Sequence, residues 1–81
     1  MNVRVRLFAS VRHSAGRESV DLDLPEEATI GQLRCRLADE LPAMAALIER
    51  AMFASDMQYA RDTDKIRPGA DLACIPPVSG G

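Results

Sequence analysis

The stretch TIGQLRCRLADEL, residues 29–41, has the pattern of an amphipathic helix. Its apolar side chains recur at the spacing that places them on one helix face: Ile30, Leu33, Leu37 and Leu41. Thr29 and Gln32 fit a capping box, in which the two side chains satisfy free backbone groups of the first turn. Pro42 ends the pattern because proline cannot continue a helix. We therefore expect one main helix whose apolar face packs against another layer.

Alternating segments on both sides of this helix predict that the other layer is a sheet. The predicted strands are residues 3–8, 19–24, 51–55, 57–60 and 71–75. In the first strand Val3, Val5 and Leu7 share the core face, so Phe8 is expected to point outward. The first and last strands are candidates for pairing side by side. These elements predict an α+β fold, a mixed sheet packed on one main helix.

Two shorter helices complete the expected order of elements. Ser10 is a plausible N-cap and Gly16 a plausible C-cap of a helical turn between the first two strands. Residues 42–50 predict a second short helix after the main one. Its inward side chains are expected to be Met44, Leu47 and Ile48.

The length of 81 residues predicts one domain, which we place at residues 1–75, followed by a flexible extended tail at residues 76–81. A formal net charge of −2 argues against nucleic acid or an anionic membrane surface as the main partner. No stretch is apolar for long enough to span a bilayer. Two cysteines are too few for a secreted disulfide scaffold, so we expect reduced thiols and a cytoplasmic protein.

The sequence gives little evidence that side chains of this protein are catalytic. His13, the single histidine, has no acid–base pattern around it, and Cys35 lacks a histidine partner. Cys74 shares the inward parity of Leu72 and is expected in the core. The two aspartates of the turn at residues 61–65 lack calcium-ligand spacing, and no zinc pattern or phosphate-binding glycine loop occurs. We expect neither a metal nor a permanently bound cofactor.

The end of the sequence carries the strongest chemical signal. Pro76 and Pro77 stiffen a stalk that ends in Gly80 and Gly81. Glycine has no Cβ, so such a backbone can enter a channel that any other residue would block. A terminal carboxylate is unhindered and can be activated as an acyl adenylate, which sulfur or nitrogen nucleophiles attack. The alternative is a frayed end without function.

These features resemble the MoaD-type sulfur carriers, small subunits of molybdopterin synthase with a ubiquitin-like β-grasp fold. The resemblance covers essentially the whole chain, and the Pro-Pro-Val-x-Gly-Gly end is its most specific part. The matching residues are Leu7-Phe8-Ala9, Val11-Arg12, Gly16 and Ile75-Pro76-Pro77-Val78-Ser79-Gly80-Gly81. Two positions depart from the family pattern: Ala54-Ser55-Asp56 replaces a Val-Asn-Gln-like turn, and Cys74 stands where a larger apolar residue is usual.

The resemblance implies a mechanism in which this chain is not catalytic alone. An adenylating enzyme would use ATP to convert the Gly81 carboxylate to an acyl adenylate, and a sulfurtransferase would supply sulfur to give a thiocarboxylate. Gly80 would allow the tail to thread into the large synthase subunit, expected in a two-plus-two heterotetramer. There the sulfur would pass to a cyclic pyranopterin precursor during molybdenum cofactor biosynthesis.

A docking face for that partner follows from the strand parities. Phe8 and Ile75 have outward parity, and Tyr59 is expected on a neighbouring strand, so the three predict an apolar cluster near the root of the tail. Residues of the root complete the predicted partner-binding set: Pro76, Pro77 and Val78. Arginines are expected to rim the cluster and steer an acidic partner: Arg4, Arg6 and Arg12.

Three other functions share the same fold. One is a sulfur carrier for thiamine thiazole synthesis, and another is a ubiquitin-like modifier joined to lysines through Gly81. The third is a plain binding module with an inert tail. An isopeptide ladder on other proteins would indicate the modifier, a thiocarboxylate would indicate a carrier, and full function without Gly81 would indicate the binding module.

Overall fold

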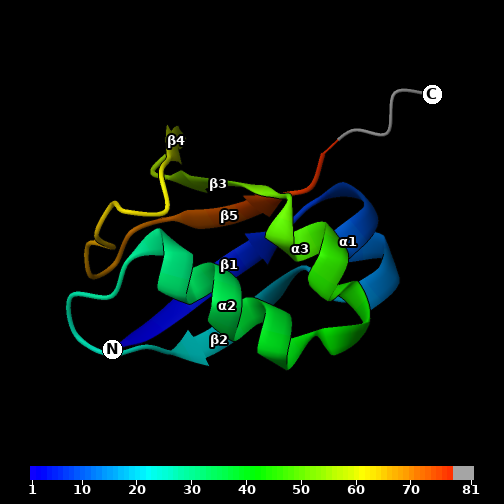
Figure 1. Ribbon diagram of the computed structural model, residues 1–81, viewed down its shortest axis with the longest axis horizontal. Coiled ribbons are helices and arrows are strands. Elements are labelled where there is room, and N and C mark those ends of the chain that lie inside the picture. The colour runs from blue at the N-terminus through cyan, green and yellow to red at the C-terminus, as the bar shows by residue number, and fades with distance from the viewer. Residues whose placement is uncertain (78–81) are drawn as a thin grey trace.

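The computed structural model describes residues 1–77, and the predictions for Val78, Ser79, Gly80 and Gly81 fall outside that range. The elements, in chain order, are β1 (Asn2–Leu7), α1 (Ala9–Ala15), β2 (Ser19–Asp23), α2 (Ile30–Glu40), the 3-10 turn η1 (Pro42–Met44), α3 (Ala45–Glu49), β3 (Met52–Ser55), β4 (Gln58–Ala60) and β5 (Leu72–Ile75) (Figure 1). The predicted element order is confirmed.

The five strands form one mixed sheet in the order β2-β1-β5-β3-β4. The central strands β1 and β5 are parallel, with Leu7 opposite Cys74, and the other pairs are antiparallel. The expected pairing of the first and last strands is therefore confirmed. Because parallel strands end at the same edge, Phe8 lies beside the end of β5, and its N–H donates to the Cys74 carbonyl at 3.2 Å.

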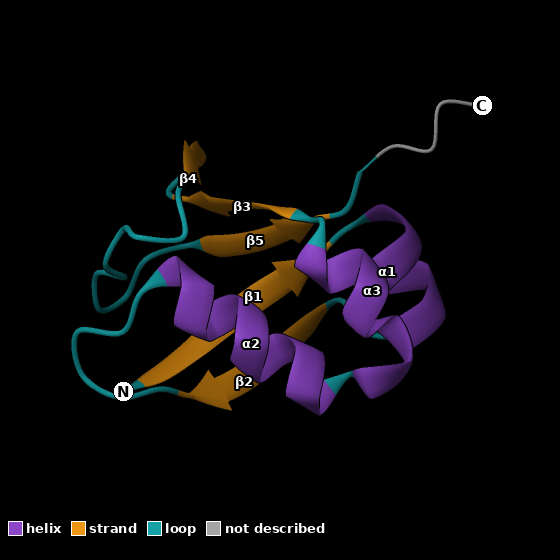
Figure 2. Ribbon diagram, viewed as in Figure 1, coloured by secondary structure: helices purple, strands orange, loops and turns teal. Residues whose placement is uncertain are grey.

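Helix α2 lies across one face of the sheet, as Figure 2 shows. Its stripe residues Ile30, Leu33 and Leu37 are buried, whereas Leu41 is half-buried at the helix end. They share one core with the inward side chains of the sheet, among them Val5, Leu22, Phe53 and Leu72. The capping box is present, because Thr29 Oγ1 accepts from the Gln32 N–H at 3.3 Å and Gln32 Oε1 accepts from the Thr29 N–H at 2.8 Å.

Several predicted boundaries are wrong by one or two residues. Strand β1 ends at Leu7, and the N-cap of α1 is Phe8 rather than Ser10, because the Phe8 carbonyl accepts from the Arg12 N–H at 3.3 Å. Gly16 is the C-cap, as predicted, with φ 67°. Residues 42–50 divide into η1 and α3, and Leu47 there is only half-buried.

Candidate functional site

An apolar hollow of about 260 Å³ lies along the sheet face opposite α2, from Asp71 just before β5 to Ile75 at the end of that strand. Ala54 and Ala73 form a cross-strand pair within it, and the small methyl groups leave room between larger neighbours. The full lining is Arg6, Phe8, Ala54, Met57, Tyr59, Asp71, Ala73 and Ile75. The sheet thus gathers side chains from β1, β3, β4 and β5 around one recess.

The three residues predicted for a docking face all line this hollow. Tyr59 is 69% exposed, whereas Phe8 and Ile75 are half-buried. Beyond Ile75, Pro76 is buried and Pro77 is exposed. The expected clustering of the three side chains is confirmed, with Ile75 at the root of the tail and Tyr59 two strands away from Ala73. The binding role of these residues stays a prediction.

Sequence reasoning missed two methionines at this face. Met57 lines the hollow and is 89% exposed, and Met52 is 50% exposed opposite Ile75 in the β3–β5 ladder. We expected Met57 inside a strand, but it occupies the turn before β4. An apolar residue in a turn indicates an exposed apolar surface, but the sequence shows this only when the position of the turn is known. The apolar surface is therefore larger than the predicted one.

The predicted arginine rim is only partly present. Arg6 lines the hollow, its guanidinium carbon lies 5.4 Å from the centre of the Phe8 ring, and it pairs with Asp71 at 2.8 Å. Arg4 instead pairs with Asp21 at 2.9 Å, and Arg12 with Glu18 at 2.8 Å. Neither of these two lines the hollow, because each reaches toward a carboxylate on or just before β2, so the prediction was wrong for both.

The Arg4–Asp21 pair also changes the titration of its own two side chains. The hydrogen bond from Arg4 holds the pKa of the Asp21 carboxyl below its ordinary value, and the same bond raises the pKa of Arg4. Both side chains are exposed, so the pair contributes little to stability. Paired charges of this kind present little net positive potential to a partner.

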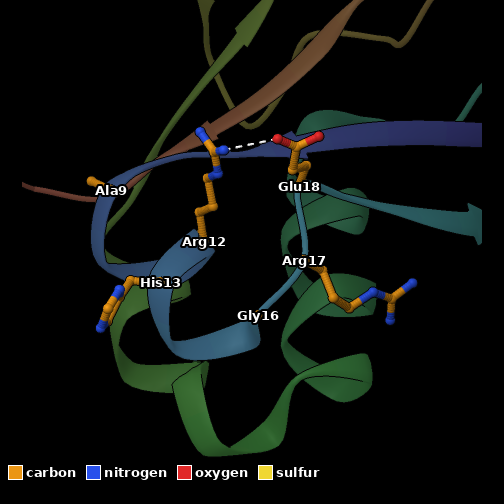
Figure 3. A pocket seen from close by; sticks show the side chains of 6 residues that line it. All are labelled: Ala9, Arg12, His13, Gly16, Arg17 and Glu18. Carbon is orange, nitrogen blue, oxygen red and sulfur yellow. Dashed lines mark hydrogen bonds and ion pairs between the residues drawn. The ribbon is translucent and has the colours of Figure 1, made fainter.

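A second hollow of about 530 Å³ lies at α1, and Figure 3 shows its lining, which includes the side chains of Arg12, Arg17 and Glu18. His13 points away from the Arg12–Glu18 pair, and Arg17 points out on the other side. The Glu18 carboxylate of this hollow pairs with Arg12 and not with His13. The turn aspartates are also explained structurally. Asp62 pairs with Arg34, Asp64 accepts from the Arg61 N–H, and residues 1–77 contain no group of three potential metal ligands.

The two cysteines are both free and differ in environment. Cys35 is exposed on α2, whereas Cys74 is fully buried in the core, as predicted. Burial raises the pKa of the Cys74 thiol to about 11. Because the thiolate is the reactive form, Cys74 is expected to be inert in the folded protein.

Alkylation with iodoacetamide at pH 8 tests this difference. We expect Cys35 to be labelled and Cys74 to react only after unfolding, because about one thiol in a thousand is ionised three units below its pKa. Intact mass measured over time gives the result. In a Cys35→Ser control the folded protein should take up no label, and rapid labelling of that control would contradict the burial of Cys74.

Known proteins of similar sequence and structure agree with this fold. Residues 5–81 match the model of the ThiS family. The molybdopterin synthase sulfur carrier subunit of Dictyostelium discoideum is 37% identical over 81 residues, which cover 96% of this chain and 94% of that protein. The crystal structure of SAMP1 from Haloferax volcanii has a TM-score of 0.85 at 26% identity, with 100% of both chains covered.

A third relative is solved as an assembly. It is the protein–protein complex of subunits 1 and 2 of the molybdopterin-converting factor from Helicobacter pylori, with a TM-score of 0.68 at 20% identity and 100% of both chains covered. That match shows the fold, and the assembly is a property of that relative. None of the helices in residues 1–77 has the length and apolar character that a membrane crossing requires. By its sequence match and its β-grasp sheet, this chain belongs to the ThiS family of ubiquitin-like proteins.

Proposed function

We propose that this chain is the sulfur carrier subunit of a molybdopterin synthase. The observation that carries the proposal is the apolar hollow beside the root of a Pro-Pro-Val-Ser-Gly-Gly sequence, because a carrier needs a docking face next to its reactive end. The name of the Dictyostelium relative, which aligns over almost the whole of both chains, supports the same function.

The proposed chemistry takes place at Gly81. A carboxylate oxygen attacks the α-phosphate of ATP in an activating enzyme, pyrophosphate leaves, and an acyl adenylate forms. The outer sulfur of a sulfurtransferase persulfide then attacks the acyl carbon, and AMP leaves to give an acyl disulfide. A thiol attacks the sulfurtransferase sulfur of that S–S bond, forms a disulfide with it and releases the Gly81 thiocarboxylate. ATP is a co-substrate of the activating enzyme and not a resident cofactor of this chain. The chain contributes the carboxylate, the narrow Gly80–Gly81 backbone and the docking face.

The proposed acceptor is the large synthase subunit, where the thiocarboxylate gives its sulfur to the pyranopterin precursor. The relative from Helicobacter pylori is solved in complex with subunit 2, which supports a partner of this kind, and two copies of each subunit are proposed. The partner would cover Phe8, Tyr59 and Ile75 and hold the tail root at Pro76, Pro77 and Val78. Phe8 and Tyr59 are aromatic side chains of the type that dominates interface energies.

Phe8→Asp tests the docking face. We expect it to weaken binding to the large subunit at least tenfold, because a charge replaces an apolar side chain in the hollow. Aspartate is a favoured N-cap residue, and Phe8 is the N-cap of α1, so the variant should fold. Isothermal titration with the purified large subunit measures the change. His13→Asp, which adds the same charge outside the hollow, is the matched control, and equal binding of all three proteins would contradict the interface.

A ubiquitin-like protein modifier is the second candidate function. It is favoured by the similarity to SAMP1 and to a second crystal structure, that of small archaeal modifier protein 1 from H. volcanii, which is 25% identical to this chain. Incubation with ATP and the host extract separates the two functions. A modifier forms isopeptide ladders on other proteins, whereas a carrier accumulates as thiocarboxylate. A carrier for thiazole synthesis would also be loaded with sulfur but would not pass it to the large synthase subunit.

A further inference from the structure

The turn between β3 and β4 has an unusual backbone for its sequence. Ser55 pairs with Gln58, so Asp56 and Met57 form a two-residue hairpin loop. Their φ angles are 50° and 69°, both in the left-handed region. Tight hairpin loops with two positive φ angles strongly favour Asn-Gly or Asp-Gly, because glycine has no Cβ to clash. The first position follows that preference, and the second holds a methionine instead of glycine.

The first turn residue is compensated by hydrogen bonds. The Asp56 N–H donates to the Asp71 carbonyl at 2.8 Å, and Asp56 Oδ1 accepts from the Asp71 N–H at 3.0 Å. Arg67 donates to the other carboxylate oxygen of Asp56. These bonds tie the hairpin to the residue that precedes β5. Asp56 is thereby held in its conformation by the segment that leads into the central strand.

Met57 has no comparable compensation within the described part of the chain. Its side chain is 89% exposed, so packing against residues 1–77 does not offset its left-handed backbone. Glycine at this position would remove the strain without loss of a buried contact. Backbone strain that the fold itself does not require points to a role for the side chain.

The position of the side chain indicates that role. Met57 lines the same apolar hollow as Ile75, which lies two residues before Pro77 at the root of the tail. A protein that receives Gly81 in its own site must lie close to that root, at the Ile75 end of the hollow. If it covers the hollow as far as Tyr59, it reaches Met57 at the other end, beside Asp71. Methionine is flexible and polarisable, and it adapts well to irregular apolar surfaces. We propose that Met57 is a docking residue, held against backbone strain so that its thioether side chain contacts the large synthase subunit.

This inference rests on the proposed function, and one pair of variants tests it. Met57→Gly is expected to raise the melting temperature by roughly 4–8 °C, because the left-handed strain is relieved. The same substitution is expected to weaken binding to the large subunit about tenfold, because an apolar contact is lost. Met57→Leu is the matched control, with binding within about threefold of the unmodified chain and no gain in melting temperature.

The two measurements have separate consequences. A Met57→Gly variant that binds as tightly as the unmodified chain would overturn the docking role. A variant whose melting temperature does not rise would overturn the argument from strain. If the unmodified chain itself fails to bind the large subunit, the proposed function fails and the docking role fails with it. Opposite changes in stability and affinity are the result that supports the inference.

Discussion

Replacement of Arg34 by methionine is expected to lower the free energy of unfolding by about 3 kcal/mol. Arg34 Nη1 donates to the carbonyls of Ile48 (2.9 Å), Glu49 (3.0 Å) and Ala51 (2.7 Å), which lie at and just beyond the end of α3. Only 18% of its side chain is exposed. Its guanidinium carbon also lies 4.8 Å from the centre of the Phe53 ring. The variant leaves the carbonyls of Ile48 and Ala51, whose bonds to Arg34 are partly buried, without their donor.

Urea unfolding measures this loss, and α2 offers a matched control. Arg36 lies two residues along the same helix and pairs with Glu40 at 3.2 Å, with both side chains 41% exposed. Arg36→Met is expected to cost less than about 0.5 kcal/mol, because an exposed ion pair four residues apart contributes little. Equal midpoints for the two variants would show that Arg34 does not hold α3 against α2.

Addition of one alanine after Gly81 is expected to abolish sulfur loading. The proposed mechanism requires an unhindered glycine carboxylate in the channel of the activating enzyme, and an added Cβ would block its entry. Stability is expected to stay unchanged, because the core lies within residues 3–74. Intact mass after incubation with ATP, the activating enzyme and a sulfur donor gives the result.

Ser79→Ala is the control for this extension, since it adds no residue and leaves the final Gly80–Gly81 pair intact. It is expected to load like the unmodified chain. If the extended protein still becomes a thiocarboxylate, and mass mapping shows the added alanine in place, the terminal-carboxylate mechanism is wrong.

The elements were predictable from the sequence because their signals are local. The stripe of α2 and its Thr29–Gln32 cap, together with the alternation in β1 and β2, depend on residues close together in the chain. The outward parity of Phe8 and Ile75 follows from the same alternation, so the sequence also predicted these two residues of the candidate site.

The features that were missed depend on contacts between distant segments. Arg34 does not belong to the apolar stripe of α2, and the partners that fix its role lie 14 to 28 residues further along the chain. Arg4 pairs with Asp21 because the register of β1 against β2 places the two residues opposite each other. The alternation of apolar and polar residues in each strand does not fix that register. Met57 is exposed because it lies in the turn between β3 and β4. That turn is held by a hydrogen bond between Asp56 and Asp71, which lies 15 residues further along the chain.

The intact mass of the native-ended protein, purified from its own host under reducing conditions, tests the proposed carrier function most directly. We predict a fraction heavier by the difference between one sulfur and one oxygen atom, with the change mapped to Gly81. A plain carboxylate on every molecule, even after incubation with ATP, the activating enzyme and a sulfur donor, would contradict the carrier function and favour the modifier.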